Sequence, residues 1–237
     1  PCGADDGVLL INMHHIISDG WSVGVLLDEL SKLYEGYRSG REVVLPPLPI
    51  QYADYAVWQR ETLQGEVLEG HLAYWREVLR GAPALLALPL DHARPAVQSH
   101  RGAVVRFGLD AELTAGLKRV CRCEGVTLFM LLLSGYQVLL SRLSGQTDVC
   151  VGIPVAGRTR RELEGLIGFF INAVVIRMEL GGKPRLTDYL QRLKERTLGA
   201  YGHQDVPAEL LLEALKVERN LSYGPLAQVG FTLQNVP

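Results

Sequence analysis

The chain of 237 residues has few cysteines, and this excludes one large class of protein. Its four cysteines form no C-x-x-C pair and lie at Cys2, Cys121, Cys123 and Cys150. Four are too few for the disulfide framework of a secreted protein of this length. We therefore expect a protein of the reducing cytoplasm.

Long apolar runs and clusters of basic residues are also missing. The longest apolar stretch, Thr127 to Leu143, is interrupted by polar residues and predicts a buried helix, not a membrane span. The whole chain has 24 Lys and Arg residues and 26 Asp and Glu residues, which are interspersed and leave a net charge of -2. We therefore expect no basic face for nucleic acid. No signal peptide is evident. We expect neither a membrane nor a nucleic acid as partner.

The residues that are present, 48% hydrophobic and 21% charged, suffice for a sizeable core. Their periodicity alternates between strands and helices and predicts a mixed α/β fold. Strands are expected over 8–13, 105–109, 149–155, 169–180 and 226–233. Helices are expected over 23–37, 52–63, 68–80, 113–120 with Asp110 as its cap, and 127–143, with two more that begin near Thr187 or Asp188 and at Pro207. Prolines at 46, 47 and 49 suggest a junction between two lobes.

The stretch MHHIISDGWS, Met13 to Ser22, is the densest group of candidate site residues. Neighbouring side chains on a strand point to opposite faces, so only one of His14 and His15 can face a given cavity. This argues against a metal site, although Asp19 could be a third ligand. One interpretation is a core histidine hydrogen-bonded to the backbone; the other is an imidazole that takes a proton near neutral pH. Gly20 would permit a backbone angle that other residues resist.

HHIISDG matches the H-H-x-x-x-D-G signature of condensation domains of non-ribosomal peptide synthetases and, more loosely, of chloramphenicol-acetyltransferase-like acyltransferases. Further stretches follow in the order typical of that family: YADYAVW (52–58), GIPVAGR (152–158), IGFFINAVVIR (167–177), HQDVPAE (203–209) and a degenerate RNLSYGPL (219–226). The chain thus resembles a condensation domain over nearly its whole length. Ala173 stands where the family usually has Thr. The upstream motifs, one with an arginine thought to pair with the motif aspartate, are missing.

The resemblance implies a two-lobed α/β fold with the first lobe truncated. Residues 1–45 would be the end of the N-terminal lobe and carry the histidine motif, and 46–237 would be the C-terminal lobe, ending near the start of its latch. Two carrier-protein arms would enter a tunnel between the lobes. The α-amine of an acceptor aminoacyl thioester would then attack a donor thioester to form an amide.

The same resemblance implies the partners: upstream and downstream peptidyl carrier domains and an adjacent adenylation domain. The substrates would be carried on the 4'-phosphopantetheine of the carriers, and the domain itself would bind neither a cofactor nor a metal.

His15 would lie at the centre of the tunnel as a base or as a positioning group, with His14 as a packing and turn residue. Asp19 would hold the loop, and Gly20 would offer its backbone N–H. Asn172, Trp21 and Gln204 would line the tunnel. From the residues alone, Trp21 and Trp58 are interpreted as core aromatics, Asn172 fits a structural hydrogen bond equally well, and Gln204 belongs to a polar cluster at a helix end. Arg158 could pair with Asp19, but we expect it to face solvent.

Three alternatives to amide formation remain: epimerisation of a carrier-bound residue, acyl transfer from coenzyme A, and a catalytically silent module that recruits other enzymes. Epimerising relatives tend to read Val-Asp-Gly-Val-Ser where this chain has Ser18 to Ser22, and silent modules tend to lose the second histidine. The donor and acceptor amino acids, and whether the donor is L or D, stay open. The chain alone is expected to be inactive and poorly soluble.

Overall fold

The computed structural model describes residues 7–99 and 101–234, and the chain divides into two compact units. Unit 1 comprises the residues up to Leu63 together with Ala156–Ile171, and unit 2 comprises the remainder. The prolines suggested a boundary after residue 45, whereas the chain up to Leu63 stays with unit 1. The assignment of the units to lobes stays a prediction.

Unit 1 is helical in its described part, and its core is small and aromatic. Its elements are the 3-10 turn η1 (His15–Ile17), α1 (Gly20–Ser39), α2 (Tyr52–Thr62) and the 3-10 turn η2 (Arg161–Leu163). Gly40 ends α1 because its φ of 64° reverses the chain, a conformation that glycine adopts without strain. Leu163, Leu166 and Phe170 are buried against Ile50, Tyr52 and Tyr55.

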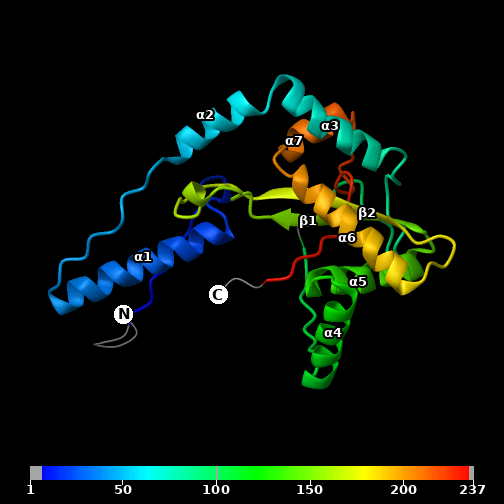
Figure 1. Cartoon of the computed structure of the whole chain (residues 1–237), viewed down its shortest axis with the longest axis horizontal. Coiled ribbons are helices and arrows are strands. Elements are labelled where there is room, and N and C mark those ends of the chain that lie inside the picture. The colour runs from blue at the N-terminus through cyan, green and yellow to red at the C-terminus, as the bar shows by residue number, and fades with distance from the viewer. Residues whose placement is uncertain (1–6, 100, 235–237) are drawn as a thin grey trace. The chain divides into compact units, whose positions relative to one another are not determined.

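Unit 2 holds the sheet and the larger core. Its elements are α3 (Gly65–Leu79), α4 (Ala111–Glu124), α5 (Leu128–Ser144), β1 (Asp148–Val155), β2 (Asn172–Glu179), α6 (Leu186–Gly202) and α7 (Ala208–Ala214). The strands pair antiparallel, with Asp148 opposite Glu179 and Val155 opposite Asn172. Helix α5 contacts β1, α6 contacts β2, and the two helices pack together, as Figure 1 shows. Trp75, Leu133, Val149, Val151 and Leu193 are among the fully or almost fully buried residues.

The helix predictions are confirmed to within a few residues. Asp110 caps α4 by accepting a hydrogen bond from Leu113 N at 2.7 Å, and Pro207 directly precedes α7. The expected cap of α6 is wrong: the helix begins at Leu186, so Thr187 and Asp188 lie inside its first turn.

Two strand predictions are wrong. Residues 8–13 and 105–109 form no strand, and Leu10, Val105 and Phe107 are each more than 80% exposed. A strand needs a backbone partner, and no described segment pairs with either stretch. Of the expected strand 226–233, only a parallel bridge from Gly230 to Gly152 forms.

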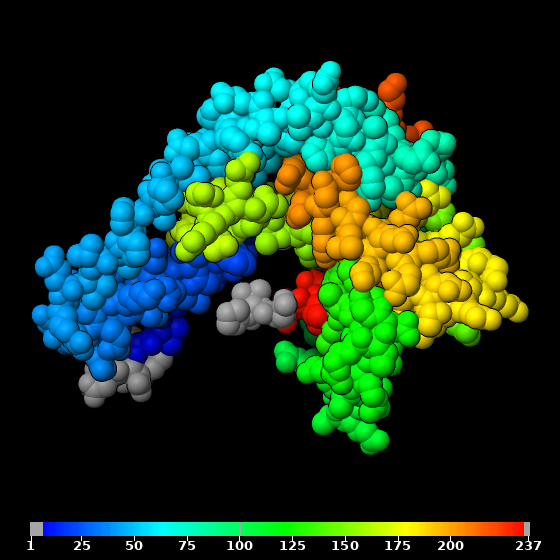
Figure 2. All heavy atoms as spheres, viewed as in Figure 1, coloured from blue at the N-terminus to red at the C-terminus, as the bar shows by residue number. Residues whose placement is uncertain are grey.

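Helix α1 has an apolar face that no described segment covers. Leu27, Leu33, Tyr34 and Tyr37 are 50%, 42%, 64% and 93% exposed. Much of α1, in blue, is uncovered on the face turned to the viewer in Figure 2. An apolar surface of this kind favours association, so the expectation of poor solubility stays a prediction with a physical basis.

No single described helix is long and apolar enough to cross a membrane, whereas α4 and α5 together have the length and composition of a span but are bent by 104° relative to each other. Six residues of α5 are buried within unit 2, among them Leu133 and Leu140, as expected of a core helix.

Candidate functional site

The loop that carries the histidines belongs to unit 1 and begins with a tight turn. His14 precedes η1, and its Nδ1 accepts a hydrogen bond from Ile16 N at 3.0 Å. This is the turn role expected of His14, but its side chain is exposed and does not pack into a core. The strand expected to lead into the two histidines is absent, and the turn sets the directions of their side chains instead.

The imidazole of His15 is anchored on one nitrogen and exposed. Its Nδ1 lies 2.7 Å from the carbonyl oxygen of Ser18. Because a carbonyl oxygen can only accept, Nδ1 must carry the proton. Nε2 of the neutral ring therefore keeps its lone pair, which is the state that a proton acceptor needs. The ring also meets Phe169 edge-on, with centroids 5.3 Å apart.

Asp19 is buried and holds the start of α1. Its Oδ1 accepts hydrogen bonds from Ser22 N at 2.8 Å and from Arg158 Nη2 at 3.1 Å, and its Oδ2 accepts one from Phe170 N at 3.0 Å. Burial raises the pKa of Asp19, but the hydrogen bonds from Ser22, Phe170 and Arg158 outweigh it and hold this pKa below its ordinary value. The contacts are those of a loop-holding carboxylate.

Arg158 does not face solvent, and that expectation is wrong. Its side chain is only 1% exposed and forms an ion pair with Asp19, whose side chain is 3% exposed. Its Nη1 donates to the carbonyl oxygens of Leu163 and Leu166, and its guanidinium lies 4.1 Å above the ring of Phe170. A charge that must leave solvent needs such partners. Pairing with Asp19, the less favoured alternative, is what the structure shows.

Ser22 connects the start of α1 to the segment 168–170. Its hydroxyl oxygen lies 2.7 Å from Asp19 Oδ1 and 2.9 Å from Gly168 O, and it accepts a hydrogen bond from Gly168 N at 3.1 Å. The hydroxyl has one proton and donates to one of the two acceptors at a time. Sequence reasoning missed Ser22, because a serine three residues after an aspartate is a common feature of helix starts.

The special backbone angle expected of Gly20 and the core position expected of Trp21 are wrong, whereas the N–H role of Gly20 and the tunnel role of Trp21 stay predictions. Gly20 is the first residue of α1, is absent from the positions with positive φ, and has open space where a Cβ would lie. Gly20 is therefore not needed for a special backbone angle. Trp21 is 38% exposed and not a core residue, and its indole N–H donates to Glu164 O at 2.9 Å. The indole thus joins α1 to the residues after η2.

Two other glycines are required by close approach. A Cβ on Gly157 would lie 1.9 Å from Phe170 O, and the φ of Gly157 is +65°. A Cβ on Gly168 would lie 2.2 Å from a ring carbon of Tyr52. These glycines let the segment around Phe170 pack against Arg158 and α2 without clashes.

Asn172 and Gln204 lie in unit 2 and contact each other. The side-chain amide of Asn172 donates to Gln204 O and Val206 O, both at 2.7 Å. Gln204 Nε2 donates to Tyr201 O at 2.8 Å. Of the two roles left open for Asn172, these contacts provide the structural hydrogen bond; its tunnel role and that of Gln204 stay predictions.

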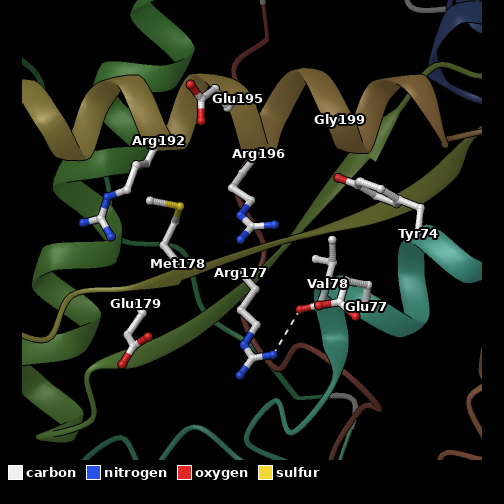
Figure 3. A pocket seen from close by; sticks show the side chains of 10 residues that line it. All are labelled: Tyr74, Glu77, Val78, Arg177, Met178, Glu179, Arg192, Glu195, Arg196 and Gly199. Atoms are coloured by element: carbon white, nitrogen blue, oxygen red, sulfur yellow. Dashed lines mark hydrogen bonds between the residues drawn. The ribbon is translucent and has the colours of Figure 1, made fainter.

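Unit 2 also contains a cavity of about 580 Å³ bordered by α3, β2 and α6 (Figure 3). Arg177 on β2 lines it, but its guanidinium is committed: it binds Asp148 through Nε at 2.9 Å and Nη2 at 2.7 Å, and Nη1 donates to two carbonyl oxygens. Arg192 and Arg196 lie one turn apart on α6 beside it (Figure 3). None of the predicted site residues lines this cavity.

Metal ligation by the histidine loop was argued against from the sequence, with Asp19 as a conceivable third ligand. Within residues 7–99 and 101–234, no three His, Cys, Asp or Glu side chains gather closely enough to hold an ion. Both oxygens of Asp19, the third ligand considered, are taken by hydrogen-bond donors.

Comparison with known proteins identifies relatives over nearly the whole chain. The Condensation domain family matches residues 2–237. A linear gramicidin synthase protein of Brevibacillus parabrevis is 55% identical over 230 residues, which are 97% of this chain but only 3% of that protein. Malpinin synthetase of Mortierella alpina is 50% identical over 231 residues, which are 98% of this chain and 3% of that protein.

Solved structures also match this chain over most of its length. The X-domain from teicoplanin biosynthesis superposes with a TM-score of 0.83 at 32% identity, over 92% of this chain and 49% of that one, and it has also been solved in a complex with OxyB. Holo-AB3403, a four-domain nonribosomal peptide synthetase bound to AMP and glycine, superposes with a TM-score of 0.82 at 33% identity, over 92% of this chain and 16% of that one. The chain spans half or less of the length of each of these relatives.

Proposed function

The chain belongs to the condensation-domain family, and from this premise we propose that it forms an amide bond between two carrier-bound substrates in non-ribosomal peptide synthesis. The acceptor's amine nitrogen attacks the carbonyl carbon of the donor thioester. A C–N bond forms, the C–S bond breaks, and one proton passes from nitrogen to the departing sulfur. The substrates arrive on the phosphopantetheine of peptidyl carrier domains, beside an adenylation domain, within a cytoplasmic synthetase.

The observation that carries this proposal is the contact of His15 Nδ1 with Ser18 O. An exposed imidazole whose Nδ1 donates to Ser18 O presents Nε2 as a proton acceptor. An α-amine has a pKa of about 7.7–8.0, so most of it is protonated at neutral pH and a base is useful. General-base catalysis contributes roughly 10²- to 10⁴-fold. Because thioesters are activated acyl donors, alignment of the two substrates contributes as well.

Amide formation between two loaded carrier domains tests the proposal, with the chain alone and with the longer synthetase segment that contains it. We expect His15→Ala to slow the reaction of the longer segment, with recovery at high pH if His15 acts as a base. His92→Ala, at another exposed histidine, is the matched control and should leave the rate unchanged. A wild-type rate for His15→Ala would exclude a role in chemistry.

A second candidate function follows from the likeness to the X-domain, which has been solved in a complex with OxyB. On that alternative the chain is a binding module that forms no amide. The same assay separates the two, because a binding module would yield no product with either carrier order while still retaining a partner enzyme in a pull-down.

A further inference from the structure

The ring of His15 has contacts on two sides. On one side Nδ1 meets Ser18 O at 2.7 Å, and on the other Phe169 meets the ring at 85° with centroids 5.3 Å apart. The side chain is exposed. An exposed imidazole with one hydrogen bond could rotate and exchange that bond for water, so the aromatic neighbour matters for its orientation.

Phe169 is itself held by its backbone. Its carbonyl oxygen accepts a hydrogen bond from Tyr52 OH at 2.8 Å. The residue before it, Gly168, bonds to Ser22, and the residue after it, Phe170, donates to Asp19 at 3.0 Å. Three consecutive residues are therefore anchored to three different side chains.

Burial alone does not explain the Phe169 side chain. Phe169 is 39% exposed, whereas Phe170 is 4% exposed. A large apolar group that stays this exposed contributes less to folding than a buried one. The hydrogen-bonded backbone of residues 168–170 instead presents the ring to the imidazole of His15.

We propose that Phe169 is a positioning residue for His15 and that Tyr52, through the Phe169 carbonyl, fixes its place. The Phe169 ring blocks rotation of the imidazole and keeps Nδ1 on Ser18 O, so Nε2 stays available as acceptor. This inference rests on the proposed function, in which Nε2 of His15 receives the proton of the amine.

The tautomer of His15 is the direct readout. In the full chain with ¹⁵N-labelled histidine, at a concentration where size exclusion shows one species, the ring-nitrogen shifts of His15 report which nitrogen carries the proton. We expect Phe169→Ala to lower the fraction with Nδ1 protonated, and Tyr52→Phe to lower it less. Phe107→Ala and Tyr37→Phe make the same changes at residues that are 87% and 93% exposed, and should have no effect.

Turnover in the longer segment gives the second readout. We expect Phe169→Ala to lower kcat for amide formation about 10- to 100-fold, the cost of a misplaced catalytic group, with KM for the loaded acceptor little changed. The kcat of Phe169→Leu should lie between that of the wild type and that of Phe169→Ala. Because Phe169 acts through His15, adding Phe169→Ala to His15→Ala should cost nothing further.

An unchanged His15 tautomer in Phe169→Ala overturns the proposal, as does a full additional loss of rate in the His15→Ala background. If Phe169→Ala does not fold, Tyr52→Phe, which removes one hydroxyl, decides the question by the same tautomer measurement. If Phe169→Ala shifts the tautomer of His15 but the wild type forms no amide, the positioning role of Phe169 is supported and the proposed function is overturned.

Discussion

Replacing Asp19 by alanine tests whether this carboxylate holds the loop or takes part in the chemistry. The change removes the hydrogen-bond acceptor for Ser22 N and Phe170 N and the counter-charge of Arg158. The side chains of Asp19 and Arg158 are 3% and 1% exposed, so water does not replace what is lost. We therefore expect Asp19→Ala to lower stability as well as activity.

The size of the effect follows from two contributions. Breaking a buried ion pair by removing one partner costs about 3–5 kcal/mol, and loss of an N-cap costs about 0.5–2 kcal/mol. The same carboxylate provides both, so the values overlap and are not summed. Arg158 keeps the carbonyl oxygens of Leu163 and Leu166, which favours the lower end, near 3 kcal/mol. That is a large part of the roughly 5–15 kcal/mol that stabilises a domain.

The assay is urea unfolding together with amide hydrogen exchange of the peptide that covers residues 165–171. Hydrogen exchange reports unit 1 directly, because the amide of Phe170 donates to Asp19. In Asp19→Ala we expect this amide to lose protection. The double variant with Arg158→Met, which removes the unpaired charge, should be less destabilised than the sum of the two single variants by at least about 1 kcal/mol.

Asp19→Asn is the matched control, since it keeps the shape and one acceptor oxygen and should unfold at an intermediate urea concentration. An Asp19→Ala protein within about 0.5 kcal/mol of wild type, with protection at Phe170 retained and turnover abolished, would refute the loop-holding role and make the carboxylate chemical.

Three further predictions concern the same structure. The pKa of Asp19 is lowered on folding, so its contribution to stability is present above the ordinary value of 3.8 and is lost as the pH falls through the lowered value; acid titration of wild type against Asp19→Asn should show a shallower loss in the variant. Burial raises the pKa of Cys150 to about 12, and Cys123 is exposed; iodoacetamide at pH 8 should alkylate Cys123 in the native chain and Cys150 only after unfolding, as mass spectrometry can read. Gly157→Ala should destabilise the chain by more than about 2 kcal/mol in urea unfolding, because the new Cβ meets the carbonyl of Phe170 at a positive φ, and equal stability would contradict the tight approach.

The helices were predictable because their signals are local. Asp110 and Thr127 cap α4 and α5, and Gly125 and Gly145 end these helices with positive φ values. Each signal lies within a few residues of the helix end that it determines. Pairing of strands is a non-local property, and for this reason the alternating apolar pattern of 105–109 predicted a strand where the structure has an exposed, unpaired segment.

The candidate site shows the same difference between local signals, which the sequence reveals, and non-local contacts, which it does not. The motif itself indicated His15 and Asp19, but the partner of Asp19 could not be read from spacing, since Arg158 lies 139 residues later. An arginine after an apolar strand faces solvent more often than not, and this led to the wrong expectation. Gly157 gave the available signal: a glycine just before an arginine, at the end of a buried strand, indicates a close approach of backbone to another group.

The network around Asp19 has a consequence for recombination between synthetases. Residues 19–22 and 157–170 are far apart in the chain, yet they share an ion pair and the hydrogen bonds between Ser22 and Gly168. A crossover anywhere between them gives a chimera that inherits the two halves of this network from different parents. Crossovers that keep both segments from one parent should give folded chimeras more often. Where two parents differ at either segment, the two segments should be exchanged together.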